Sequence, residues 1–274
     1  MKEPIVSVAW LHTNLEDPNV IILDASLKEN QSNLKTGLEN IQIKGARYFD
    51  IKHTFSDRAT PLPNTLPSPK QFEIEARKLG INKSSVIVVY DTLGIYSSPR
   101  AWWLFKIMGH QNVAVLDGGL PEWINKDYPV AEIPENPIYS VGNFQAKFIP
   151  ELIKSKEQIL ENIRTKDAVL IDARAENRFK VIGDEPRPGL RSGHIPGSIN
   201  IPYTQLLQNG KFLPKEELLT ILKTDDKPLL FTCGSGITAC IDLIAYELIS
   251  KNPKSVYDGS WTEWGQLDNL PIEK

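Results

Sequence analysis

The sequence predicts an α/β protein built from two tandem domains, each a parallel sheet flanked by helices. First, the chain has 274 residues, which fits two domains of average size, with one large domain as the rival interpretation. Second, continuous apolar runs alternate with helical stretches, a pattern typical of strands covered by helices on both faces of a parallel sheet. Third, parts of the first half recur in the second half.

Six short apolar runs are predicted to be buried strands, and the first three end in Asp, Gly or Ala, as strand-to-loop turns often do. They are VIILDA (20–25), VIVVYD (86–91), VAVLDGG (113–119), AVLIDAR (168–174), PLLFT (228–232) and SVYDGS (255–260). Helices are predicted over residues 69–78, 98–108, 155–164 and 237–251.

An internal repeat supports the division into two domains. Asp24-Ala25 corresponds to Asp172-Ala173, IKGARYFDI (43–51) to IPGSINIPY (195–203), and LDGGLPEW (116–123) to YDGSWTEW (257–264). The segment between the halves contains prolines and has no clear period, so it is interpreted as a linker. We therefore predict a first domain over 1–135, a linker over 136–148 and a second domain over 149–274.

Composition limits the kinds of partner that the protein is expected to have. The formal charge is −3, which provides no electrostatic reason to expect nucleic acid or an acidic membrane surface. No apolar run has the length of a signal peptide or a membrane span. The four histidines are scattered without metal-ligand spacing. Two cysteines form no disulfide framework, so a reducing, cytoplasmic location is expected.

The stretch FTCGSGITAC (231–240) raises the question of chemistry. Cys233 follows a predicted strand, stands before a Gly-Ser-Gly turn and precedes a predicted helix. Main-chain N–H groups of such a loop can surround an anion, and a helix N-terminus adds partial positive charge. A thiol there is expected to have a lowered pKa. The spacing alone also allows a buried small hydrophobe, which is the interpretation we favour for Cys240.

Two further features bear on this choice. The first half has Asp91 at the place of Cys233, so sulfur chemistry is predicted for the second half alone or for neither half. The segment 172–198 carries several possible cations in a Pro/Gly-rich loop, which suggests a carboxylate or oxyanion site. They are Arg174, Arg178, Arg187, Arg191 and His194. Surface ion pairs with Asp184 and Glu185 are the alternative for at least one arginine.

These residues are similar to motifs of a known family. Over nearly its whole length the chain resembles the two-domain rhodanese-type sulfurtransferases, and most closely the mercaptopyruvate sulfurtransferase branch. The motifs that carry the resemblance are CGSGIT (233–238), NRF (177–179), EPRPG (185–189), GHIPGS (193–198) and YDGSWTEW (257–264). The resemblance implies tandem rhodanese-like domains, of which the first is inactive and the second is catalytic.

The resemblance also implies roles for individual residues. Cys233 would be the nucleophile that accepts sulfur, and Arg178 and Arg187 would bind the carboxylate and keto group of the substrate. The cradle around the sulfur would be the backbone of Gly234, Ser235, Gly236, Ile237 and Thr238. The expected partners are a small-molecule sulfur donor and a thiophilic acceptor such as cyanide, a small thiol or thioredoxin. Neither a metal nor an organic cofactor is expected.

The chain departs from the branch at two positions. A histidine of the branch is replaced by Asn64 in PLPNTLP (61–67), and the residue that matches its upstream acid is Lys52. A Ser-His-acid relay is therefore not expected, and His53 is not assigned this role.

Three other functions stay open at this point. A thiosulfate sulfurtransferase typically has basic side chains in the loop, whereas residues 234–239 carry none. A related phosphatase needs an arginine at the position of Ala239. A non-catalytic persulfide carrier would hold sulfur without releasing pyruvate.

Overall fold

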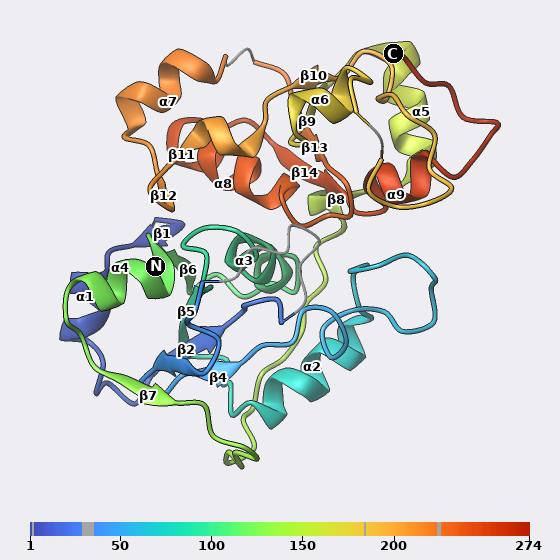
Figure 1. Cartoon of the computed structure of the whole chain (residues 1–274). Coiled ribbons are helices and arrows are strands. Elements are labelled where there is room, and N and C mark those ends of the chain that lie inside the picture. Colours follow the sequence, from blue (N-terminus) through green and yellow to red (C-terminus); the bar gives the residue numbers. More distant parts are fainter. Residues whose placement is uncertain (2, 29–35, 184, 224–225) are drawn as a thin grey trace. The chain divides into compact units, whose positions relative to one another are not determined.

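The chain folds into two compact units. The computed structural model describes residues 1, 3–28, 36–183, 185–223 and 226–274 (Figure 1). The N-terminal unit contains residues 1–58, 66–149 and 209–212, and the C-terminal unit contains residues 59–65, 150–208 and 213–274. The limits 1–135, 136–148 and 149–274 stay a prediction.

The described part of the N-terminal unit contains a parallel five-stranded sheet in the order β1-β6-β5-β2-β4 (Figure 1). Its strands are β1 (Ile5–Val6), β2 (Val20–Asp24), β4 (Arg47–Tyr48), β5 (Val86–Tyr90) and β6 (Val113–Leu116). Two further strands, β3 (Ile41–Ile43) and β7 (Val130–Glu132), pair with each other in antiparallel fashion. The helices are α1 (Val8–Thr13), α2 (Pro69–Lys78), α3 (Ser98–Ile107) and α4 (Gly119–Asn125).

The described part of the C-terminal unit repeats this arrangement, with a parallel sheet in the order β10-β9-β13-β14-β8. Its strands are β8 (Ile153–Lys154), β9 (Val169–Asp172), β10 (Ile199–Asn200), β13 (Leu229–Thr232) and β14 (Lys254–Tyr257). The helices are α5 (Lys156–Thr165), α6 (Glu176–Phe179), α7 (Lys215–Ile221), α8 (Ala239–Ile249) and α9 (Ser260–Trp264). Shorter elements of this unit are the 3-10 turns Pro150–Leu152 and Tyr203–Leu206 and the strand β11 (Leu207–Gln208), whereas the strand β12 (Lys211–Phe212) falls within residues 209–212 of the N-terminal unit.

The predicted fold class is confirmed, because each unit has the same strand order around a parallel sheet. Strand β2 corresponds to β9 and β5 to β13, so Asp24 and Asp172 end equivalent strands. Five of the six predicted strands end earlier than expected, and the difference is largest for β6, which ends at Leu116, and β14, which ends at Tyr257. Gly119 and Ser260 adopt positive φ angles of 52° and 51°, which turn the chain into α4 and α9.

Side-chain caps explain where two predicted helices begin. Ser68 accepts the backbone N–H of Gln71 at the start of α2, and Pro69 occupies the first turn. At the start of α5, Ser155 and Gln158 form a reciprocal capping box. In contrast, α8 starts at Ala239 rather than at 237, packs against β13 and β14, and is buried on nearly all sides. It therefore forms through packing rather than through amphipathic patterning.

No helix in the described ranges is both long enough and apolar enough to span a lipid bilayer.

Candidate active site

Cys233 lies at the carboxyl edge of the C-terminal sheet, where α/β proteins commonly bind ligands. Strand β13 ends at Thr232, which is in register with Asp172 at the end of β9. Helix α8 begins at Ala239, so residues 233–238 form the connecting loop. The Cys233 side chain makes no disulfide, and the residue is 2% exposed.

The start of α9 holds this loop through its main chain. The N–H of Cys233 donates to Ser260 Oγ (3.3 Å), and its carbonyl accepts the N–H of Trp261 (2.9 Å). The carbonyl of Gly234 accepts both the N–H (2.9 Å) and the hydroxyl (2.6 Å) of Thr262. The motif YDGSWTEW, which sequence reasoning used as a sign of the repeat and of the family, thus fixes the position of the sulfur loop.

The loop leaves several main-chain donors uncommitted. Within the described ranges, the N–H groups of Gly234, Ser235, Ile237 and Thr238 donate to no protein group. Gly236 adopts a φ of +78°, which a residue with a side chain rarely adopts. Free N–H groups next to the N-terminus of α8 are suited to an anion.

The equivalent loop of the N-terminal unit shows what such donors do when an anion is present. Asp91 follows β5 as Cys233 follows β13, and its Oδ2 accepts the N–H groups of Tyr96 (2.9 Å), Ser97 (3.0 Å) and Ser98 (2.9 Å). The Ser98 hydroxyl (2.7 Å) donates to the same oxygen, and the N–H of Leu93 (3.0 Å) donates to Oδ1. In this unit, the carboxylate at the first position of the loop therefore accepts hydrogen bonds from the N–H groups that follow it in the loop.

Two of the predicted arginines meet at the sulfur loop. A Cβ atom placed on Gly234 would lie 3.5 Å from both terminal nitrogens of Arg178 and 3.6 Å from Nη1 of Arg187. Arg178 comes from α6 and pairs with Glu185 (2.6 Å), while Arg187 donates to Ser235 Oγ (3.2 Å). Two guanidinium groups therefore converge beside the residue that follows the cysteine.

The other cations of the predicted cluster are structural. Arg174 binds the Asp172 carboxylate through Nε and Nη2, and its Nη1 binds Glu185 (3.0 Å). Arg191 donates to backbone carbonyls around the end of α9, and His194 stacks on Phe179 at 3.7 Å. The alternative of surface ion pairs needs a correction, since the Glu185 side chain is 3% exposed and pairs with the buried Arg174 and the partly buried Arg178. Asp184 lies outside the described residues.

Ser235 has two side-chain donors directed at its hydroxyl oxygen. Residues 59–65 belong to the C-terminal unit, and the Asn64 amide donates to Ser235 Oγ (3.1 Å) and to its carbonyl (3.3 Å). Arg187 supplies the second donor to Oγ. Because a hydroxyl has one proton and two acceptor sites, Ser235 then has its own proton available for a third group. Lys52 and His53 belong to the N-terminal unit, and their N–H groups donate to the Asp50 carboxylate.

Sequence reasoning missed Asp242, in the first turn of α8. Its side chain is completely buried, and neither carboxylate oxygen has a partner within the described part of the chain. Burial raises the pKa of Asp242 well above its usual value, and the negative charges of Cys233 and Asp172 raise the pKa further. The available signal was an acid inside the apolar run ACIDLIAYEL, where a helix buried on all sides has no place for an unpaired charge.

No three His, Cys, Asp or Glu side chains among the residues described lie together in a way that could hold a metal ion.

Comparison with known proteins agrees with this geometry. The family model for the rhodanese-like domain matches residues 7–126 and 155–267. The thiosulfate/3-mercaptopyruvate sulfurtransferase 1 of Arabidopsis thaliana mitochondria is 39% identical over 99% of this chain and 78% of its own length. The 3-mercaptopyruvate sulfurtransferase of Escherichia coli K12 is 38% identical over 98% of this chain and 97% of its own.

A solved structure supports the same assignment. The crystal structure of SseA from Escherichia coli, described as a 3-mercaptopyruvate sulfotransferase with the rhodanese fold, matches with a TM-score of 0.84 and 34% identity. The match covers 94% of this chain and 99% of SseA. With two matched domains and relatives that align over nearly its full length, this chain belongs to the rhodanese-like family as a tandem two-domain member.

Proposed function

We propose that this chain is a 3-mercaptopyruvate sulfurtransferase that carries sulfur as a persulfide on Cys233. The observation that carries the proposal is the loop after β13, where Cys233 precedes uncommitted N–H groups and the residue after it is flanked by Arg178 and Arg187. The names of the relatives support the same reaction.

The two arginines would bind the anionic end of the substrate. A guanidinium group can donate two parallel hydrogen bonds to a carboxylate. Arg178 and Arg187 would take the carboxylate and the keto oxygen, and Gly234 leaves both guanidinium groups uncovered because it has no side chain. The hydroxyl proton of Ser235, which Asn64 and Arg187 leave available, would stabilise the charge that develops on the keto oxygen.

The first half-reaction moves one sulfur atom to the enzyme. The Cys233 thiolate attacks the sulfur of 3-mercaptopyruvate and forms an S–S bond, while the C–S bond breaks and its electron pair stays with carbon. The leaving group is the enolate of pyruvate, which becomes pyruvate when it takes up the proton released by the new persulfide. No oxidant or reductant is consumed, and the step is covalent catalysis by an activated nucleophile.

The second half-reaction restores the thiolate. A thiophilic acceptor, such as cyanide, a small thiol or thioredoxin, attacks the outer sulfur, and the S–S electron pair returns to Cys233. Ping-pong kinetics are expected from the two steps. Thiol acceptors are abundant in a reducing compartment, so a cytoplasmic location is part of this proposal, and both Cys233 and Cys240 are free thiols.

The test is mass spectrometry after exposure to 3-mercaptopyruvate. The protein should gain the mass of one sulfur atom and release pyruvate in repeated turnovers when a thiol acceptor is present. Cys233→Ser should abolish both results, whereas Cys240→Ala, which changes the buried cysteine of α8, should leave them intact. Turnover by Cys233→Ser would exclude the mechanism, and sulfur uptake without catalytic release of pyruvate would indicate a carrier instead.

Thiosulfate is the second candidate donor. The Arabidopsis relative is named for both donors, and Arg178 and Arg187 could also bind a dianion. Residues 234–239 contain no basic side chain, which favours the mercaptopyruvate reaction. The ratio of kcat/KM for the two donors decides between them, and a large preference for thiosulfate would reverse the assignment.

A further inference from the structure

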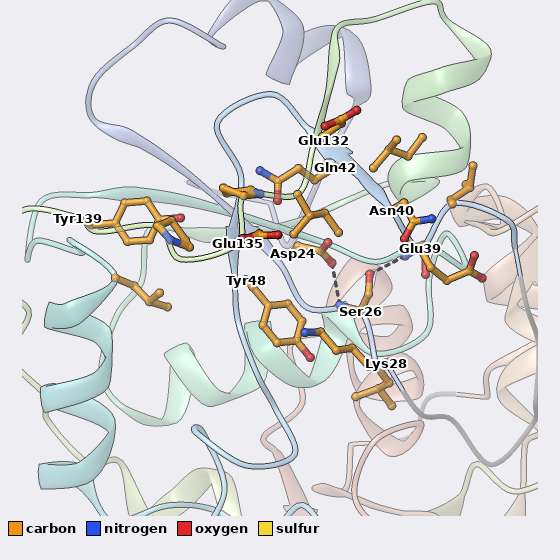
Figure 2. Close-up of a pocket in the computed structure, with 18 of the residues that line it drawn as sticks. Asp24, Ser26, Lys28, Glu39, Asn40, Gln42, Tyr48, Glu132, Glu135 and Tyr139 are labelled. Atoms are coloured by element: carbon orange, nitrogen blue, oxygen red, sulfur yellow. Dashed lines mark hydrogen bonds between the residues drawn. The ribbon is translucent and has the colours of Figure 1, made fainter.

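The N-terminal unit contains a pocket that the proposed sulfur transfer does not use. It is lined by Asp24 at the carboxyl end of β2 (Figure 2), and its volume is about 820 Å³, within the range of small-molecule sites. Asp24 and Ser26, which are joined by a hydrogen bond, line it together with Tyr48 and Lys28 (Figure 2). Other lining residues include Gln42, Glu132, Glu135 and Tyr139.

Because the two units are repeats, the surroundings of Asp24 can be compared with those of its equivalent, Asp172. Asp24 ends β2, and Asp172 ends the equivalent strand β9. The two carboxylates accept the same local hydrogen bond, from the N–H of Ser26 (2.9 Å) in one unit and of Arg174 (2.9 Å) in the other. Ser26 and Arg174 are therefore equivalent positions, each donating its backbone N–H to the aspartate that ends the strand.

The two units differ in what neutralises the carboxylate. In the C-terminal unit, Arg174 donates from Nε (2.9 Å) and Nη2 (2.7 Å) to Asp172, and its guanidinium lies 4.3 Å from the centre of the Trp261 ring. In the N-terminal unit the equivalent residue is Ser26, whose side chain carries no positive charge. Asp24 is 4% exposed and forms no ion pair with any described residue.

A buried carboxylate without a counter-ion is electrostatically unfavourable. Burial raises the pKa of Asp24, and the negative charge of Asp91 acts in the same direction. A cation that reached Asp24 through the pocket would favour the ionised carboxylate, as Arg174 does for Asp172.

The walls of the pocket suit a cation with an organic body. Tyr48 and Tyr139 line the pocket with aromatic rings. The Lys28 ammonium lies 4.5 Å from the centre of the Tyr48 ring, which is a cation–π contact. Glu132 and Glu135 line the pocket and form no ion pair with the described residues. The acidic side chains of the lining outnumber the lysines, of which Lys78 is paired with Glu75 (2.9 Å).

We propose that this pocket binds a small organic cation, whose guanidinium or ammonium group occupies against Asp24 the place that the Arg174 side chain occupies against Asp172. The Glu132 and Glu135 carboxylates attract the cation, and the tyrosine rings contact its body. The site is separate from Cys233 and does not depend on the identity of the sulfur donor.

A matched pair of probes tests the ligand class. N-acetyl-L-argininamide and N-acetyl-L-citrullinamide have nearly the same shape, but only the first carries a guanidinium charge. Titration by ligand-observed NMR should show binding of the arginine probe at least tenfold tighter than of the citrulline probe. Asp24→Asn should remove this preference without changing sulfurtransferase turnover. Equal binding of the two probes, or no binding of either at millimolar concentration, would overturn the proposal.

A peptide arm separates two sources of the cation. Capped Gly-Arg-Gly should bind no tighter than N-acetyl-L-argininamide if the ligand is a small molecule. Tighter binding of the peptide would overturn the small-molecule assignment in favour of an arginine side chain of a partner.

A second variant tests the structural template without a ligand. Ser26→Arg should place a guanidinium on Asp24 as Arg174 does on Asp172, block the arginine probe, and raise Tm by about 2–4 °C. Ser26→Gln adds similar bulk without charge and should not raise Tm. The gain from Ser26→Arg should vanish in the Asp24→Asn background, and a gain that persisted there would refute the equivalence of the two sites.

Discussion

Asp242 leads to a prediction about how stability depends on pH. Its carboxyl group is completely buried in α8, has no partner among the described residues, and has a pKa raised well above the usual value by burial and by the charges of Cys233 and Asp172. In the unfolded chain the same carboxyl is exposed to water and loses its proton near pH 4. Between that value and the raised folded-state pKa, unfolding therefore releases one proton from this residue.

The sign and size of the effect follow from proton linkage. When the folded state binds more protons than the unfolded state, stability falls as pH rises. One proton corresponds to about 1.4 kcal/mol for each pH unit, for as long as the folded state keeps the proton. Asp242→Asn has nearly the same shape and cannot titrate, so its stability should lack this slope. The difference between the two proteins should grow in favour of the variant from about pH 5 upwards.

The assay is urea unfolding at half-unit pH intervals from 5 to the folded-state pKa, analysed for the transition of the C-terminal unit because a two-unit chain need not unfold in one step. Asp268→Asn is the matched control: Asp268 is an exposed carboxylate of the same unit, and its removal should leave the slope unchanged. Parallel curves for the wild-type chain and Asp242→Asn would show that the buried carboxyl is ionised in the folded state and would refute the reasoning.

Three further predictions concern the sulfur loop. Arg187→Lys should lower kcat/KM for 3-mercaptopyruvate about 10- to 100-fold, because a lysine cannot replace a bidentate guanidinium. The free energy of unfolding, measured by urea denaturation, should stay the same. Thr262→Val should cost about 1 kcal/mol by removing the hydroxyl bond to the Gly234 carbonyl, and Thr262→Ser should retain it; equal unfolding curves for the two variants would contradict this role. Asn64→Gly removes the side-chain donor to Ser235, while glycine can still adopt the φ of 60° found at this position. In steady-state kinetics with 3-mercaptopyruvate, kcat should therefore fall about tenfold with little change in KM.

The parallel sheets could be predicted because their central strands are buried on both faces. Strands β2, β5 and β13 are continuous apolar runs, and such runs need no information about distant residues. The outer strands β1, β4, β8 and β10 each contain only two residues. Segments this short have no period of their own, so only their pairing with a neighbouring strand defines them.

The candidate site could be predicted only in part, for a similar reason. The resemblance implied roles for Cys233, Arg178 and Arg187, and the structure brings both arginines to the residue beside the cysteine. The contact between Asn64 and Ser235 joins positions 171 residues apart, which no local pattern reveals. Sequence reasoning also could not separate Arg174, which Asp172 and Glu185 engage, from the arginines that face the loop.

The two units therefore share one architecture but differ in which of two positions a charged side chain of the protein occupies. In the N-terminal unit, Asp91 occupies the anion position of the loop, whereas the cation position beside Asp24 is open to the pocket. In the C-terminal unit, Arg174 fills the cation position beside its aspartate, while the loop after Cys233 keeps its N–H groups uncommitted. Because an internal charge that fills a site also excludes a ligand of the same sign, we expect the C-terminal unit to prefer anions and the N-terminal unit to prefer cations. We therefore predict two independent sites on one duplicated fold, so saturation of the pocket by a cation should leave the rate of persulfide formation unchanged.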